Sequence, residues 1–173
     1  MNASPQVSDS NLHDTNGMDQ FLTFVLAGEH YGVDILRVQE IKGWEGVTPM
    51  PNMPDAVLGI INLRGTVVPV IDLRRHFRMA DATFDKTTVV IVVKVRDEEH
   101  GERTMGIVVD AVSEVHNIPK EDLKPAPEFG DGVDSDAIRG LASIDERMII
   151  MLDIDRLLRN GIMKHIAFTG NAA

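Results

Sequence analysis

The chain has 173 residues and no cysteine, which excludes a disulfide framework, a thiolate metal site and a cysteine nucleophile and fits a cytosolic protein. The formal net charge of −10 argues against nucleic acid or an anionic membrane as the main partner, because phosphates are neutralised by clustered Lys and Arg. The length suits one medium domain or two small ones, and we find no apolar stretch for a membrane helix and no signal segment.

The first half of the chain is predicted to consist of short strands. Residues 1–19 are rich in Asn, Ser, Asp and Gly, which predicts a flexible tail. A helical turn is predicted at 55–59, where Asp stands at the start and Gly at the end. Arg64 and Gly65 predict a tight hairpin turn, because Gly adopts a left-handed backbone at little cost. Apolar, β-branched runs predict strands at 21–26, 31–35, 38–41, 60–63 and 67–73.

The second half of the chain follows the same order. The run at 87–95 is almost wholly β-branched, which is typical of a strand buried on both faces. Further strands are predicted at 104–109, 112–115 and 147–154, with a charged hairpin tip at 97–103 and a short helix at 155–165. A Pro-rich loop contains Phe129, which either presents a contact to a partner or folds back onto the protein.

An internal repeat relates the two halves. Residues 31–41 align without a gap on residues 105–115, and residues 59–77 align on residues 140–158. Many short strands with Gly and Pro turns indicate an all-β protein, and the duplication predicts two small, closed or nearly closed barrels side by side, because closing a sheet removes its edges. The predicted divisions are a tail (1–19), a first barrel (20–84), a second barrel (85–158) and a C-terminal helical segment or tail (159–173).

Familiar catalytic and metal-binding motifs are missing from the sequence. It contains no phosphate-binding loop, no Gly-x-Ser-x-Gly elbow and no His-Glu-x-x-His pair, and its six histidines are scattered. Asp72 and Asp153 are repeat equivalents, and a residue doubled by duplication is more simply structural, closing a turn. We therefore expect no enzyme, cofactor or metal site. A hydrolase that uses Asp72, Asp110 or Asp153 is the remaining alternative from the enzyme class.

A possible binding surface consists of Val38 and Glu40, their repeat equivalents Val112 and Glu114, and Arg64 at a hairpin tip. An Arg beside exposed valines is typical of protein interfaces, where apolar anchors supply affinity and a charge sets register. The alternative is that the valines belong to the core and that Arg64 is a solvated turn residue.

Four motifs, in order along the chain, resemble the CheW family of bacterial chemotaxis coupling proteins: residues 31–41, 62–74, 105–115 and 125–129. The likeness runs from about Phe21 to Leu158. It implies two five-stranded barrels with no catalytic activity. It also implies a cytoplasmic adaptor, recruited to receptor arrays without inserting into the membrane, that couples the tips of chemoreceptors to the histidine kinase CheA. A scaffold of another CheA-type pathway, such as surface motility, is the alternative within the family.

The resemblance also implies two sets of site residues. A groove between the barrels would bind the receptor tip through Val38, Glu40, Arg64, Val112 and Val115. The regulatory domain of CheA would contact the loop that contains Lys124, Glu128 and Phe129. Position 124 is more usually Arg in this family, and Lys cannot make the same bidentate contact.

Overall fold

The computed structural model describes residues 18–80, 84–97, 101–126 and 137–158. Most of the predicted N-terminal tail, the segment 159–173, and Glu128 and Phe129 lie outside the described residues.

The described chain is mainly β, as predicted, with short helical segments between strands. The helical segments are η2 (Ile35–Arg37), α2 (Leu73–His76), η3 (Lys120–Asp122) and α3 (Ile154–Leu158). The strands are β1 (Met18–Leu26), β2 (Glu29–Asp34), β3 (Val38–Gly43), β4 (Val57–Leu63), β5 (Thr66–Asp72), β6 (Val89–Asp97), β7 (Gly101–Val109), β8 (Ala111–Pro119), β9 (Ile138–Ile144) and β10 (Arg147–Leu152).

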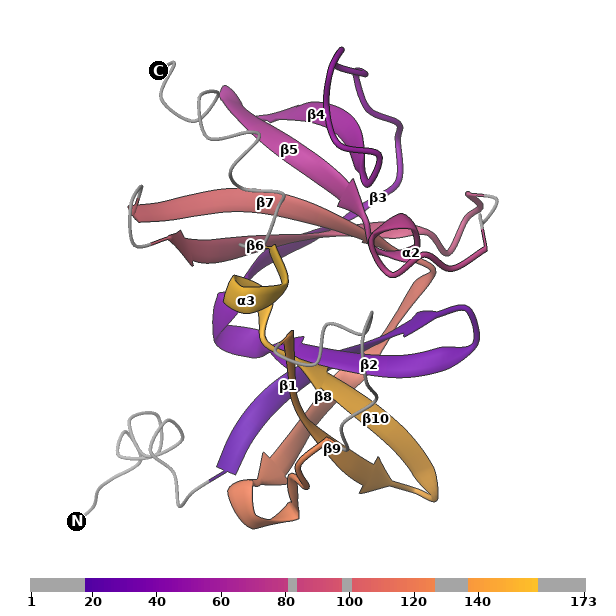
Figure 1. Ribbon diagram of the computed structural model, residues 1–173, viewed down its shortest axis with the longest axis vertical. Helices are drawn as coiled ribbons and strands as arrows, with labels where there is room; N and C mark the ends of the chain where they lie inside the picture. The colour runs from indigo at the N-terminus through magenta and orange to yellow at the C-terminus, as the bar shows by residue number, and fades with distance from the viewer. Residues whose placement is uncertain (1–17, 81–83, 98–100, 127–136, 159–173) are drawn as a thin grey trace, which may run out of the picture.

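The strands form two five-stranded sheets, one above the other in Figure 1. Barrel A has the strand order β8-β1-β2-β10-β9, and barrel B has the order β3-β6-β7-β5-β4. Each repeat gives its first two strands to one barrel and its last three to the other. The barrels therefore do not coincide with the ranges 20–84 and 85–158, because a repeat in sequence does not fix which copy a strand pairs with.

The pairing of strands obeys the repeat. In barrel A, β10 runs parallel to β2 and sets Met151 opposite Gly32. In barrel B, β5 runs parallel to β7 and sets Val70, the equivalent of Met151, opposite Gly106. A Cβ on Gly32 would lie 2.6 Å from the Met151 sulfur of the parallel strand, and one on Gly106 would lie 2.8 Å from a Val90 methyl group of β6 and 3.4 Å from a Val70 methyl group. The glycine of each repeated motif thus makes room for a core residue of a neighbouring strand.

A short antiparallel bridge closes each sheet onto itself. Thr48, which follows β3, pairs with Ile60 of β4, and Lys124, which follows β8, pairs with Leu141 of β9. Each bridge has two backbone hydrogen bonds of 2.8–2.9 Å. The closing segment passes close to a repeated glycine: a Cβ on Gly59 would lie 2.2 Å from the Thr48 carbonyl oxygen. These bridges complete two small barrels, as the sequence predicted.

The buried apolar side chains of the described residues form three clusters. One lies inside barrel B and includes Val68 and Val92, and another lies inside barrel A and includes Phe21 and Met151. The third joins the barrels and contains strand residues of both. β6 shows the consequence, because Val90 and Val92 face the interior of barrel B while Ile91, Val93 and Val95 face the shared core. This confirms the prediction of a strand buried on both faces.

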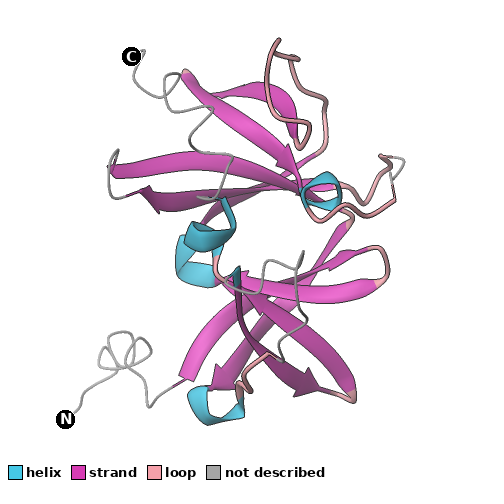
Figure 2. Ribbon diagram, in the orientation of Figure 1, coloured by secondary structure: helices cyan, strands magenta, loops and turns pink. Residues whose placement is uncertain are grey.

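The short helices α2 and α3 lie at the junction of the barrels (Figure 2) and pack apolar residues into the shared core. The helical turn predicted at 55–59 is wrong, because Val57 begins β4 and pairs with Ile71. The hairpin turn at 64–65 is confirmed. Both residues have positive φ (Arg64 51°, Gly65 89°), and the Gly65 N–H donates to Asn62 Oδ1 at 2.7 Å.

Gly59→Ala should lower the free energy of unfolding by about 1–3 kcal/mol, the usual cost of overpacking. The added methyl group would meet the backbone carbonyl of Thr48, which cannot move without opening the barrel. Gly43→Ala is the control, because a Cβ added there would meet no atom within 4 Å. Urea unfolding followed by circular dichroism measures both. Equal effects of the two variants would contradict the role of Gly59 in closure.

Candidate functional site

Two of the predicted receptor-contact residues touch each other on barrel B. Glu40, on β3, accepts a hydrogen bond from Arg64 at the tip of the β4–β5 hairpin. The Arg64 side chain is 71% exposed, and that of Glu40 is 27% exposed. The hydrogen bond from Arg64 lowers the pKa of Glu40, so the carboxylate stays charged well below neutral pH. Arg64 is thus a solvent-facing cation whose direction is set by a carboxylate on the neighbouring strand.

A hollow of about 350 Å³ opens between β3 and β4, the strand that precedes the Arg64 turn. Its lining is mixed, with the polar residues Lys42 and Asn62 beside the apolar residues Ile61, Val47 and Val90. The outer end of barrel B therefore combines apolar surface with an oriented charge.

The predicted valines have different surroundings. Val38 and Val112 are repeat equivalents, and both are partly buried against the shared core. The alternative that they belong to the core is thus correct in part. Val115 is 48% exposed on β8, and its repeat equivalent Ile41 is 44% exposed on β3. Ile41 was not predicted from the sequence as an exposed apolar residue, although the repeat aligns it with Val115.

The two barrels differ in charge where they are otherwise equivalent. The residues of barrel A that align with Glu40 and Arg64 are Glu114 and Asp145, and both are acidic. Glu114 has His116 as a neighbour at 3.5 Å in place of an arginine. Barrel A therefore lacks the equivalent of the Glu40–Arg64 ion pair, and a partner that reads this pair can distinguish the barrels.

Lys124 is the described member of the predicted kinase contact. Its backbone closes barrel A by pairing with Leu141, and its side chain is exposed. Its position is therefore fixed by the sheet while its ammonium group faces solvent.

The three candidate hydrolase carboxylates have structural roles. Asp72 is buried, which raises its pKa, and it caps α2 by accepting from the Arg74 N–H at 3.0 Å. Asp153 accepts from the Arg156 N–H at 3.2 Å in the same manner. These contacts confirm that the paired aspartates close turns.

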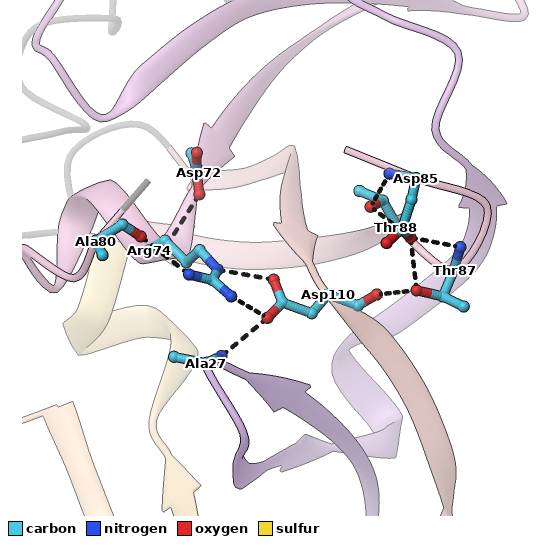
Figure 3. A network of polar contacts seen from close by, with 8 residues as sticks. All are labelled: Ala27, Asp72, Arg74, Ala80, Asp85, Thr87, Thr88 and Asp110. Carbon is cyan, nitrogen blue, oxygen red and sulfur yellow. Dashed lines mark hydrogen bonds and ion pairs between the residues drawn. The ribbon is translucent and has the colours of Figure 1, made fainter. Parts of the chain in front are cut away.

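Asp110 belongs to a network that the sequence did not predict (Figure 3). Arg74 donates from Nε to Oδ1 at 2.9 Å and from Nη2 to Oδ2 at 2.6 Å, a bidentate contact. The Ala27 N–H donates to Oδ2 at 2.8 Å. Burial acts to raise the pKa of Asp110, but the hydrogen bonds from Arg74 and Ala27 outweigh it and lower the pKa. Arg74 Nη1 also donates to the Ala80 carbonyl oxygen at 2.9 Å, so the guanidinium group is held by both Asp110 and Ala80.

Two further observations concern metal-binding groups and membrane-spanning helices among the described residues. Within residues 18–80, 84–97, 101–126 and 137–158, no group of three His, Cys, Asp or Glu side chains could hold a metal ion. Over the same ranges, no helix has the length and apolar character to cross a membrane.

The fold and the site define a class of protein: a double-barrel protein with an oriented ion pair and exposed apolar side chains on its surface. Residues 20–161 match the family described as CheW-like domain. The chain is 44% identical to the chemotaxis protein CheW of Klebsiella aerogenes, over 89% of this chain and 88% of that protein. It is 36% identical to the chemotaxis protein CheW of Rhizobium meliloti, over 86% and 93% of the two chains. The crystal structure of the scaffolding protein TtCheW from Thermoanaerobacter tengcongensis superposes with a TM-score of 0.74 at 33% identity, over 84% of this chain and 91% of that one.

The chain therefore belongs to the CheW family, and the resemblance drawn from its motifs is confirmed. This membership makes it a non-catalytic chemotaxis adaptor with the CheW fold.

Asp110→Asn should lower the free energy of unfolding by about 1–2 kcal/mol at pH 7, because it weakens charge-assisted hydrogen bonds to a mostly buried group. The pKa of Asp110 is lower in the folded state, so its contribution is complete above the unfolded value and is lost as the pH falls through the folded value. The difference between the variant and the parent protein should therefore shrink below about pH 4.

Urea titrations at a series of pH values measure this difference. Glu102→Gln is the control, because Glu102 is 51% exposed and its ion pairs are 3.8–3.9 Å long. Its effect should stay within about 0.5 kcal/mol. A pH-independent difference for Asp110→Asn would contradict the assigned ionisation.

Proposed function

We propose that this protein couples the cytoplasmic tips of transmembrane chemoreceptors to the histidine kinase CheA, as a cytoplasmic adaptor recruited to receptor arrays. The observation that supports this most strongly is the family match, which spans both barrels and includes every proposed contact residue. The resemblance of the motifs to the family assigns one surface to each partner.

The proposed receptor site consists of Val38, Glu40, Arg64, Val112 and Val115. Arg64 is exposed and held by Glu40, so a partner meets a charge whose direction is already fixed. Such preorganisation lowers the entropy lost on binding. The exposed Val115 offers an apolar anchor on the other barrel. A helical hairpin tip with apolar residues along one face and an acceptor for Arg64 has the chemistry that fits this surface.

The proposed kinase site consists of Lys124, Glu128 and Phe129. The exposed Lys124 follows β8, the strand that carries Val112 and Val115, and its backbone is fixed by the closure of barrel A. A displacement at the receptor site therefore reaches the kinase site along a strand that belongs to a closed sheet.

The proposed mechanism depends on geometry and involves no bond-making. An adaptor that binds the active and inactive arrangements of a kinase equally well does not change the equilibrium between them, whatever its affinity. This protein would act by holding receptor and kinase at a fixed separation, so that a receptor conformation favours one kinase arrangement over the other.

Arg64→Ala and Val38→Asp should each weaken binding to receptor-containing membranes by at least about tenfold, a loss of about 1.4 kcal/mol. The first removes the oriented charge, and the second puts a carboxylate on an apolar contact. Arg64→Ala should fold and still bind the kinase. Val38 packs partly against the shared core, so circular dichroism must show that Val38→Asp folds before its loss of binding is assigned to the groove. Co-sedimentation with membranes, with and without CheA, measures the binding, and autophosphorylation of CheA measures the coupling.

Asp145→Ala is the matched control, because Asp145 is the repeat equivalent of Arg64 at the tip of the β9–β10 hairpin. It should bind receptor membranes as the parent protein does. Parental binding by Arg64→Ala or Val38→Asp would show that the groove assignment is wrong. A parent protein that binds neither receptors nor CheA from its own organism would refute the proposed function itself.

A further inference from the structure

A second ion pair occupies the place in the repeat that corresponds to the Arg74–Asp110 pair. Arg37, in η2, donates from Nη2 to Asp155 Oδ2 at 2.6 Å, and Asp155 lies in α3. The alignment of residues 59–77 on 140–158 makes Asp155 the equivalent of Arg74. The alignment of residues 31–41 on 105–115 places Arg37 and Asp110 one position apart at the same bend. The two pairs therefore occupy equivalent places with their charges reversed.

Each pair lies where the chain crosses from one barrel to the other. Asp110 stands between β7 of barrel B and β8 of barrel A, and Arg37 stands between β2 of barrel A and β3 of barrel B. Each crossover residue binds the helix that follows the last strand of a barrel: α2 after β5, and α3 after β10. In Figure 2, α2 and α3 lie between the two barrels. We call Arg74–Asp110 and Arg37–Asp155 the crossover ion pairs.

Each ion pair includes one helix, α2 or α3, that follows a strand of one barrel. The carboxylate of the pair also accepts a hydrogen bond from a strand end or turn of the other barrel. Asp110 pairs with α2, which follows barrel B, and accepts from the Ala27 N–H in the β1–β2 turn of barrel A. Asp155 lies in α3, which follows barrel A, and accepts from the Arg96 N–H near the end of β6 in barrel B at 2.8 Å. Ala27 and Arg96 are equivalent in the pairing of the two hairpins. Each carboxylate therefore connects its own segment to two others, and in both cases the three segments include parts of both barrels.

The shared apolar core holds the barrels together but is a weak constraint on their orientation, because burial of apolar surface is nondirectional. Hydrogen bonds between Arg and a carboxylate are directional, and the side chains here are only 16–27% exposed. Two such contacts, on separate crossovers, restrain rotation of one barrel against the other more than either contact alone.

We propose that the crossover ion pairs fix the relative orientation of the barrels, and that Arg37, Arg74, Asp110 and Asp155 are positioning residues for coupling rather than for binding. This inference rests on the proposed function, because coupling is what a fixed orientation serves. None of the four residues belongs to the proposed receptor or kinase site. Loss of the pairs should therefore leave the affinity for each separate partner intact and reduce the effect of the receptor on the kinase.

The test combines a distance measurement with a coupling assay. The chain has no cysteine, so Thr66→Cys on barrel B and Ser143→Cys on barrel A, both exposed, accept spin labels without other changes. Pulsed electron resonance then gives the distribution of inter-barrel distances. The parent protein should give one narrow peak, and the variant Arg74→Gln with Asp155→Asn should give a distribution at least about twice as wide, as expected when an orienting contact is lost.

The unlabelled variant should lower receptor-dependent activation of CheA by about tenfold, a normal size for a coupling effect, with its affinity for receptor membranes and for CheA, each alone, changed less than about threefold. The single variants Arg74→Gln and Asp155→Asn keep one pair intact and give a folded protein if the double variant does not fold. The control is Arg156→Gln with Glu102→Gln, which breaks only exposed ion pairs. It should match the parent protein in both measurements.

Three results would overturn the inference. The first is an unchanged distance distribution in the double and single variants, and the second is a wider distribution with kinase activation equal to that of the parent protein. The third is a loss of affinity for one partner that is as large as the loss of kinase activation. Failure of the proposed function is a different result. In that case the parent protein itself does not change kinase activity, while the spin-label measurement still reports whether the crossover ion pairs orient the barrels.

Discussion

Neither repeat can close a barrel alone, and the rest of the structure depends on this constraint. Each repeat gives a hairpin to one barrel and three strands to the other, so both barrels need both halves of the chain. The parallel pairs β2–β10 and β5–β7 join the two contributions, and in each pair one strand carries a glycine that leaves room for a core residue, Met151 at Gly32 and Val90 at Gly106. The two barrels are consequently one folding unit with two chain crossovers and a common core.

The duplication kept its geometry and changed its charges. The closing bridges, the repeated glycines and the aspartate caps of α2 and α3 occur in both copies, because each solves a packing or backbone problem that arises twice. At the barrel tips, by contrast, Arg64 aligns with Asp145. A symmetric fold can bind two different partners only if its equivalent surfaces differ, and this difference in charge is one that a partner can read.

Local features of the sequence predicted local structure well. The strands and the turn at Arg64 and Gly65 follow from patterns within a few residues, and the turn-closing role of Asp72 follows from its repeat equivalence with Asp153. The error at 55–59 has the same origin, since Asp55 and Gly59 have the spacing of helix caps while Gly59 is needed for a backbone contact with Thr48.

The exchange of strands between barrels could not be predicted, because two copies of one pattern pair equally well within a copy or between copies. The Arg74–Asp110 contact spans 36 residues and joins side chains that no motif connects. The sequence and its family resemblance selected both Glu40 and Arg64, but their ion pair emerges only when β3 and the β4–β5 hairpin meet.

An adaptor without catalytic chemistry has only its shape and its affinities with which to act. If one partner contacts Arg64 at the tip of barrel B while the other binds the loop after β8 of barrel A, coupling between these two contacts has to cross from barrel B to barrel A, through the crossovers or the shared core. Burial in a core of Val, Ile, Leu and Phe is nondirectional, whereas the hydrogen bonds of the crossover ion pairs are directional and add a separate restraint on orientation. The partly buried carboxylates at the crossovers are costly to place there unless all of their hydrogen bonds are made. One ion pair at each crossover, with the acidic and basic partners exchanged, is what a protein needs when the angle between its two halves matters more than the stability of either half.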